Sequence, residues 1–133
     1  MKADIDAIVA LATTSGSPAY FVDVPTEPTY PYHLVWSSGG NLALERPVTD
    51  SHADIDDLIG VTTVAGTPAG VLIAQANVRA VLDLKSPVVA GRTTVLELVS
   101  SQPVQIDRDV KIPETNRSPA YGVDLYRYRS SPA

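Results

Sequence analysis

The chain has 133 residues, of which 44% are hydrophobic and 19% are charged. This balance predicts one globular domain over residues 1–133, large enough to form its own core. The formal net charge of −5 disfavours general binding to nucleic-acid backbones, because that affinity comes from clustered lysines and arginines. The absence of cysteine excludes disulfides, thiolate catalysis and cysteine-ligated metals.

The first predicted element is a helix over residues 2–14. Its apolar stripe has the i, i+3, i+4, i+7 spacing of a helix with one buried face: Ile5, Ile8, Val9 and Ala12. Asp4 and Asp6 lie in the first turn, where the helix dipole favours acidic side chains. The same carboxylates interrupt the apolar run, so we expect no signal peptide, and no window reaches the ~18 apolar residues of a membrane span.

Extended segments follow this helix. Residues 19–25 alternate in polarity and predict a strand with one apolar face, made of Tyr20, Val22 and Val24. Three prolines then break the chain into an irregular link: Pro25, Pro28 and Pro31. A second strand is predicted over residues 32–38. The polar and acidic residues 41–57 predict an exposed loop or hairpin, and an excursion of this length in a small domain more often has a function or forms an interface than neither.

The middle of the chain contains the clearest helix signal. Residues 58–66 are rich in β-branched side chains and predict a strand. Thr67 is a good N-cap and Pro68 suits the first helical position, so a helix is expected over 67–83. Its main apolar stripe consists of Val71, Ala74, Val78, Val81 and Leu82. A second set falls on nearly the opposite side: Ile73, Ala80 and Leu84. A helix with two apolar sides needs two partners, its own sheet and a second surface such as another subunit.

Extended segments complete the chain. They are a strand over 93–101, an extended segment over 104–110, a loop over 111–119 and a final strand over 120–129. The order of these elements predicts an α+β fold, with an antiparallel or mixed β-sheet of about four to six strands and two helices packed on one face.

The final strand combines three tyrosines with two arginines. Alternation assigns Tyr121, Val123 and Leu125 to its core face. The residues left for another surface are Tyr126, Arg127, Tyr128 and Arg129. A base-stacking platform would need a basic, aromatic-rich sheet, whereas tyrosine and arginine are enriched at protein interfaces. We therefore expect these four residues to contact a protein partner.

Charges also alternate in the segment before the last loop. If residues 104–110 are extended, Asp107 and Asp109 point to one face and Arg108 to the other. Three interpretations are open: an acid–base pair, a strand end whose charges face water, or charges that pair with a neighbouring subunit and orient it.

The sequence contains no recognisable catalytic or cofactor-binding constellation. His33 falls in a predicted strand and His52 in a loop, without the convergent ligands that a metal site needs. The acidic run near them departs from a calcium loop, because Leu58 occupies the fifth position counted from Asp54. A phosphate-binding loop and a nucleophile elbow are both missing. We therefore expect no enzymatic activity, no metal and no cofactor.

The C-terminal segment PVQIDRDVKIPETNRSPAYGVDLYRYRSSPA resembles the end of the tail terminator proteins of long-tailed phages that infect actinobacteria. Those proteins close with an extended D-R-D-V segment, a short loop, a V-D-x-Y-R strand and a small polar tail. Upstream, YPYHLVWSSGG resembles the early strand and turn of the family. IGVTTVAGTPAGVLIAQANVRAVLD resembles its strand, glycine and alanine-rich helix. The resemblance covers most of the chain through the order and spacing of these pieces, and it is weakest over 41–57.

The resemblance implies an α+β subunit that forms a ring, usually a hexamer, on the end of the tail tube. Such a ring stops tube polymerisation and presents a surface to the head-side connector, while DNA passes through without specific binding. The implied partners are further copies of the chain, the tail tube protein and the head–tail connector protein. The implied location is the neck of a virion tail, after synthesis in the host cytoplasm and with no membrane. Two alternatives stay open: another neck protein, such as an adaptor or stopper, and a small enzyme or ligand-binding domain.

Overall fold

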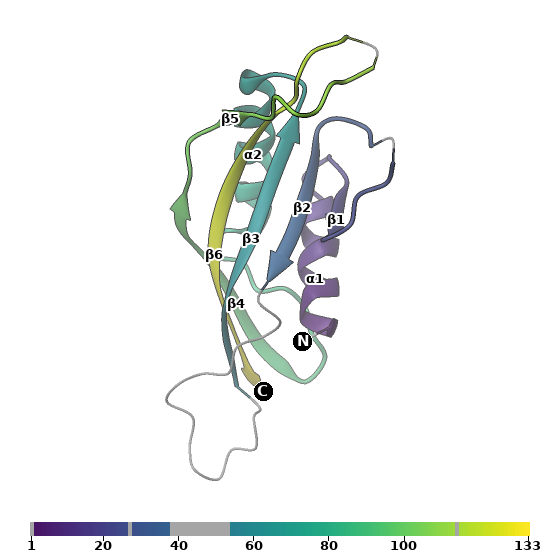
Figure 1. Cartoon of the computed structure of the whole chain (residues 1–133). Helices are drawn as coiled ribbons and strands as arrows, with labels where there is room; N and C mark the ends of the chain where they lie inside the picture. Colours follow the sequence, from purple (N-terminus) through teal and green to yellow (C-terminus); the bar gives the residue numbers. More distant parts are fainter. Residues whose placement is uncertain (1, 27, 38–53, 114) are drawn as a thin grey trace.

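The computed structural model describes residues 2–26, 28–37, 54–113 and 115–133. Two helices pack against one side of a six-stranded sheet (Figure 1). The helices are α1 (Lys2–Thr13) and α2 (Pro68–Leu82), and the strands are β1 (Ala19–Phe21), β2 (Tyr32–Ser37), β3 (Ile55–Ala65), β4 (Arg92–Ser101), β5 (Gln105–Ile106) and β6 (Ala120–Pro132). Within the described residues, neither the length nor the hydropathy of any helix suits it to cross a bilayer.

The sheet is mixed, with strand order β1-β2-β3-β6-β4 and with β5 paired to β6. β1 runs parallel to β2, and the other pairings are antiparallel. β3 and β6 form the central pair, in register from Ile55 opposite Ser130 to Ala65 opposite Ala120. These features confirm the predicted α+β class, with a mixed sheet and two helices on one face.

The core lies between the sheet and the helices. It is built from Ile5, Ile8 and Ala12 of α1, Val78 and Leu82 of α2, and Val35, Ile59, Val61, Leu96, Tyr126 and Tyr128 of the strands. A smaller cluster under the start of α2 contains Val71, Ala65 and Ala120. The apolar stripes predicted for both helices therefore face the sheet as expected, with Val9 and Val81 only partly buried at their margins.

The start of α2 follows from local chemistry. Thr67 is extended, and its hydroxyl oxygen accepts a hydrogen bond from the Gly70 amide at 3.0 Å. Pro68 occupies the first turn, where its missing N–H costs nothing. At the other end, Asp83 leaves the helical conformation with ψ 128°. The predicted range of 67–83 thus includes the two capping residues.

Two predicted extended segments are shorter than expected. β1 ends at Phe21 because Val22 adopts φ 64°, a left-handed conformation that breaks the alternation predicted as far as residue 25. After β5, the chain turns instead of remaining extended to residue 110. The amide of Asp109 donates to the Asp107 carboxylate at 3.2 Å, and Val110 N donates to Asp107 O at 3.4 Å. The strand alternation assumed for Asp107, Arg108 and Asp109 is therefore wrong.

The predicted excursion over 41–57 falls mostly outside the described residues, which omit 38–53. Its last three positions, residues 55–57, belong to β3.

Candidate protein interface

The side of α2 that faces away from the sheet carries no charged residue. Arg79 is the one charged residue in the helix, and it points inward. We call the exposed residues on this side the outer α2 face: Ala69, Leu72, Ile73, Ala76, Asn77, Ala80 and, just after the helix, Leu84. Ile73 is 65% exposed and Leu84 is 71% exposed. A solvated helix face normally carries polar and charged side chains, so this composition is typical of a surface that another element covers.

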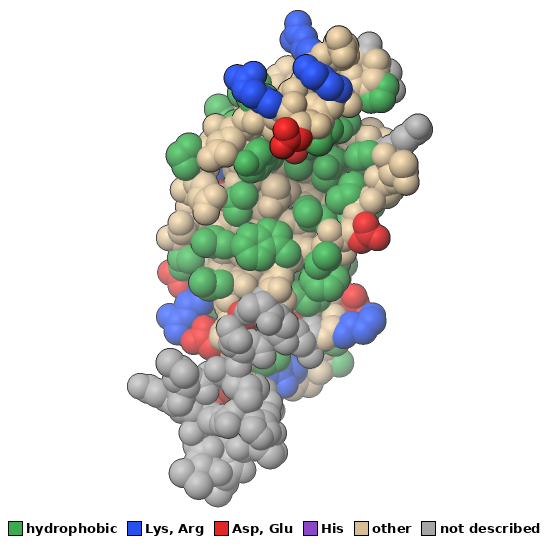
Figure 2. All heavy atoms as spheres, in the orientation of Figure 1, with side chains coloured by type: hydrophobic (Ala, Val, Ile, Leu, Met, Phe, Trp, Pro, Cys, Tyr) green, Lys and Arg blue, Asp and Glu red, His purple; other side chains and the backbone are tan. Residues whose placement is uncertain are grey.

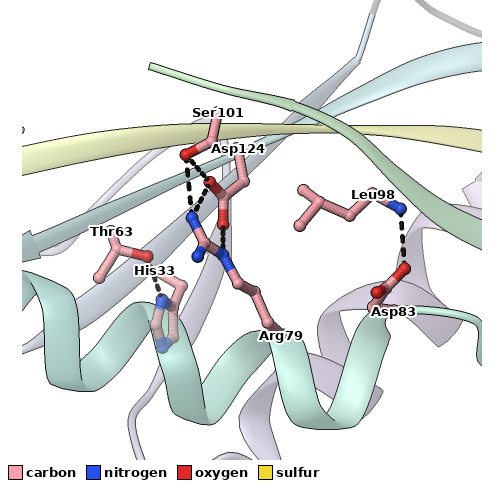
Figure 3. Close-up of polar contacts among 7 residues, drawn as sticks. All are labelled: His33, Thr63, Arg79, Asp83, Leu98, Ser101 and Asp124. Atoms are coloured by element: carbon pink, nitrogen blue, oxygen red, sulfur yellow. Dashed lines mark hydrogen bonds and ion pairs between the residues drawn. The ribbon is translucent and has the colours of Figure 1, made fainter. Parts of the chain in front are cut away.

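Arg79 forms an ion pair with Asp124 of β6 beneath the helix. Its Nε and Nη2 atoms lie 2.7 Å and 2.8 Å from the two carboxylate oxygens of Asp124 (Figure 3). Ser101 Oγ donates to the same carboxylate at 2.7 Å and accepts from Arg79 Nη2 at 2.9 Å. The Asp124 side chain is 1% exposed, and its hydrogen bonds raise the pKa of Arg79. The single cation of α2 therefore neutralises a buried carboxylate.

The chain after α2 is attached to the edge of β4. The Asp83 carboxylate accepts from the Leu98 amide at 2.9 Å (Figure 3). Leu84 N donates to Leu96 O at 2.8 Å, while Leu84 itself adopts φ 58°. These bonds satisfy the outer edge of β4 here and hold the exposed Leu84 side chain at the end of the outer α2 face.

A second apolar surface is the side of the sheet that neither helix covers. Register places residues of three strands side by side on it, for example Leu34 beside Thr62 and Thr62 beside Val123. We call this set the open sheet face: Tyr32, Leu34, Trp36, Leu58, Thr62, Val64, Tyr121, Val123 and Leu125. Figure 2 shows hydrophobic side chains over the middle of this side and charged ones toward its ends. Like the outer α2 face, the set contains no charged residue.

Trp36 lies against the backbone of β3 within this surface. A Cβ atom at Gly60 would come within 2.0 Å of the indole, so only glycine leaves room for the ring. The indole Nε1 donates to Thr62 Oγ1 at 3.1 Å, and the residue remains 37% exposed. The open sheet face therefore presents a positioned aromatic side chain, a residue type enriched at the centres of protein interfaces.

Ion pairs flank one end of the open sheet face. Arg127 binds Asp56 through two hydrogen bonds, of 3.0 Å and 2.7 Å, which lower the pKa of the Asp56 carboxyl. Arg129 lies 3.7 Å from Glu97. The predicted partner residues Arg127 and Arg129 are thus exposed, and each already has an acidic partner within the chain.

A hollow of about 230 Å³ opens at the other end of this face. Its lining includes Tyr30, Tyr32, Tyr121 and Asp107. The rings of Tyr30 and Tyr32 are 5.6 Å apart, and burial together with Tyr30 and Asp107 raises the pKa of Tyr32. The hollow is below the ~300 Å³ at which small-molecule pockets begin. Its size suits one side chain of a partner.

The two tyrosines predicted to meet a partner are core residues. Tyr126 and Tyr128 are 0% exposed on the helix side of β6. Tyr128 donates its hydroxyl hydrogen to the carboxylate of Asp4, which joins the last strand to the first helix. The residues expected in the core, Tyr121, Val123 and Leu125, are instead half-buried on the open sheet face. The predicted assignment of the two faces of β6 is therefore wrong.

This reversal has a physical cause that the local pattern did not reveal. The helix side of β6 looks polar in sequence because it carries Gly122 and Asp124 beside the tyrosines. The negative charge of the buried Asp124 is neutralised by its ion pair with Arg79. Gly122 leaves space for the side-chain amide of Gln75, whose nitrogen would lie only 2.4 Å from a Cβ atom at position 122. One sequence feature is consistent with this arrangement: Arg79 is the single charged residue of α2, and an arginine that points into the domain needs an acidic partner from another element.

One of the two histidines considered as metal ligands has a structural role. His33 is fully buried, with Nδ1 2.9 Å from Thr63 Oγ1 (Figure 3) and Nε2 3.4 Å from Ser15 Oγ. Burial lowers the pKa of His33 to about 4, so the ring is neutral at pH 7. Across the described ranges, no three His, Asp or Glu side chains converge to hold a metal ion. His52 lies outside the described residues.

Comparison with known proteins shows similarity in structure and none in sequence. No protein family matches the sequence, and no curated protein matches it. Among solved structures, a chain of the "Virion of native gene transfer agent (GTA) particle" matches with a TM-score of 0.56 and 15% sequence identity. The match covers 93% of this chain and 84% of that one. The two chains therefore share a fold over nearly their whole lengths.

Proposed function

We propose that this chain is a structural protein of a virion and that it acts there as the tail terminator. In this role it forms a ring on the end of the tail tube, stops tube polymerisation and joins the tail to the head-side connector. The observation that carries the proposal is the fold shared with a virion chain over 93% of the sequence. The ordered resemblance of its segments to tail terminators of actinobacterial phages supports the finer assignment.

The surfaces of the molecule suit a ring subunit. Each subunit of a closed ring has a neighbour on both sides and so needs two contact surfaces. The outer α2 face and the open sheet face are two exposed, uncharged surfaces on opposite sides of the domain. A net charge of −5 also suits a ring around DNA, because an acidic wall does not trap phosphates. The proposed role requires no catalysis.

The test is a null mutant of the gene, imaged by negative-stain electron microscopy. If the chain is the terminator, its loss gives tubes of uncontrolled length, and wild-type protein supplied in trans restores a single length. Free tails of normal length would instead assign it to another neck position, the adaptor or stopper. Joined particles with normal tails would refute a role in this junction altogether.

A further inference from the structure

We propose that the outer α2 face of one copy docks on the open sheet face of the next copy, so that copies of this chain join head to tail. The inference deepens the proposed ring and rests on it, because it names the surfaces through which neighbouring subunits touch. It follows from the charge, placement and size of the two faces.

The two faces are compatible in charge, because neither set contains a charged residue. The cation of α2 is engaged with Asp124 beneath the helix, so none remains on the outer side. Arg127 pairs with Asp56 and Arg129 with Glu97 at one rim of the open sheet face, and Asp107 lines the hollow at its other end. Docking the middle of one face on the other therefore brings uncharged side chains together and leaves these charges at the margin of the contact.

The placement of the faces selects a head-to-tail contact. α2 packs on β3 and β6 from the helix side, while the open sheet face is the reverse side of the same strands. A two-fold contact brings the same patch of both copies together, so it covers one face and leaves the other exposed. A head-to-tail contact covers both, and repeating it builds a ring wherever the rotation closes.

The size of the faces indicates that the contact is weak and forms only when another structure, such as the tube end, holds the copies together. The 15 residues of α2 span about 22 Å. The open sheet face from Leu58 to Val64 spans about 20 Å along β3 and about 14 Å across three strands. These dimensions enclose a flat rectangle of roughly 300 Å², which is small beside the ~800 Å² of accessible surface that each partner buries in a standard stable interface. Free copies should therefore be mainly monomeric and should associate when a tube end holds them together.

The chain contains no cysteine, so single engineered cysteines report contacts without interference. We would place one on the outer α2 face (Ile73→Cys), one on the open sheet face (Leu58→Cys) and a control on α1 (Ala10→Cys), all at exposed positions. Each variant, each pairwise mixture and the Ile73→Cys/Leu58→Cys double variant are treated with a short bismaleimide. The experiment is run with and without assembled tail tube, and circular dichroism verifies folding.

Head-to-tail docking predicts that neither single variant cross-links with itself. The mixture of Ile73→Cys with Leu58→Cys gives covalent dimers, at least tenfold more than either mixture with Ala10→Cys. The double variant gives a ladder that stops at the number of subunits in the ring. Strong dimers of Ile73→Cys alone or Leu58→Cys alone would show two-fold contacts and overturn the proposal. Cross-linking that does not exceed the Ala10→Cys control, even with tube present, would overturn it as well.

A second measurement keeps this inference separable from the proposed function. Trp36 is the only tryptophan and lies on the open sheet face, so docking should shift its emission to shorter wavelength. Tube length is measured in the same samples with wild-type protein. If the protein stops tube growth but shows neither the shift nor cross-links, the named surfaces are wrong and the function stands. If both docking signals appear while tube growth is unaffected, the terminator assignment fails and the interface stands.

Discussion

Two buried tyrosines on one strand provide a matched test of how this fold is held together. Tyr126 and Tyr128 are both fully buried on β6. The Tyr128 hydroxyl binds the carboxylate of Asp4, which is itself only 3% exposed, whereas the Tyr126 hydroxyl has no hydrogen-bond partner among the residues that the structure describes. Substitution by phenylalanine removes the same single oxygen at each site, so the difference between the variants measures the polar contacts of the Tyr128 hydroxyl, with Asp4 and with Ser130.

The expected effects differ in size. Hydrogen bonds to charged groups contribute about 1.5–3 kcal/mol, and Tyr128→Phe also leaves a buried carboxylate without this donor, so we expect a loss of about 2 kcal/mol. Tyr126→Phe removes a buried hydroxyl that gains nothing from folding, so its effect should stay within about 0.5 kcal/mol or be stabilising. For a chain of this length, a loss of about 2 kcal/mol corresponds to roughly 6–10 °C in Tm.

The assay is urea unfolding followed by far-ultraviolet circular dichroism, with thermal unfolding as a second measure. Because Asp4 belongs to α1, hydrogen exchange in that helix should also quicken in Tyr128→Phe and remain unchanged in Tyr126→Phe. Equal losses in the two variants, or a larger loss for Tyr126→Phe, would refute the reasoning from the Tyr128–Asp4 bond.

Three further predictions concern the buried ion pair, the buried histidine and the tightest glycine. Arg79→Met leaves the Asp124 carboxylate buried without its cation and should cost about 3 kcal/mol in urea unfolding, and adding Asp124→Leu should recover most of that loss because an apolar pair replaces the ionic one. The lowered pKa of His33, about 4 against 6.5 in the unfolded chain, means that the unfolded state takes up the proton first. Stability should therefore be complete above pH 6.5 and fall by up to about 3 kcal/mol as the pH drops to 4, and a His33→Gln variant whose stability declines as steeply would contradict this. Gly60→Ala should push the Trp36 indole off the sheet, costing about 1–3 kcal/mol and shifting its fluorescence to longer wavelength, so an unchanged emission spectrum would count against the contact.

The sequence by itself determined the elements whose causes are local. The start of α2 depends on Thr67 and Pro68, which act within one turn, and both capping features were recognisable from the sequence. The core stripe of α2 and its second apolar side also follow from helical spacing, and Ile73, Ala80 and Leu84 are exposed as predicted. Whether those three residues contact a partner remains a prediction.

Only the tertiary structure decided which side of β6 faces the core. In sequence, Tyr121, Val123 and Leu125 form the more apolar row, and the row containing Asp124 and Tyr128 looks suited to an outer surface. The opposite arrangement is stable because two distant partners satisfy the polar groups: Arg79, 45 positions from Asp124, and Asp4, 124 positions from Tyr128. Burial of a polar side chain depends on whether a partner reaches it in the folded chain, and alternation along a single strand carries no information about that partner. The open sheet face, the main surface assigned to a neighbouring copy, was therefore not recognisable until the fold placed Arg79 and Asp4 beneath the sheet.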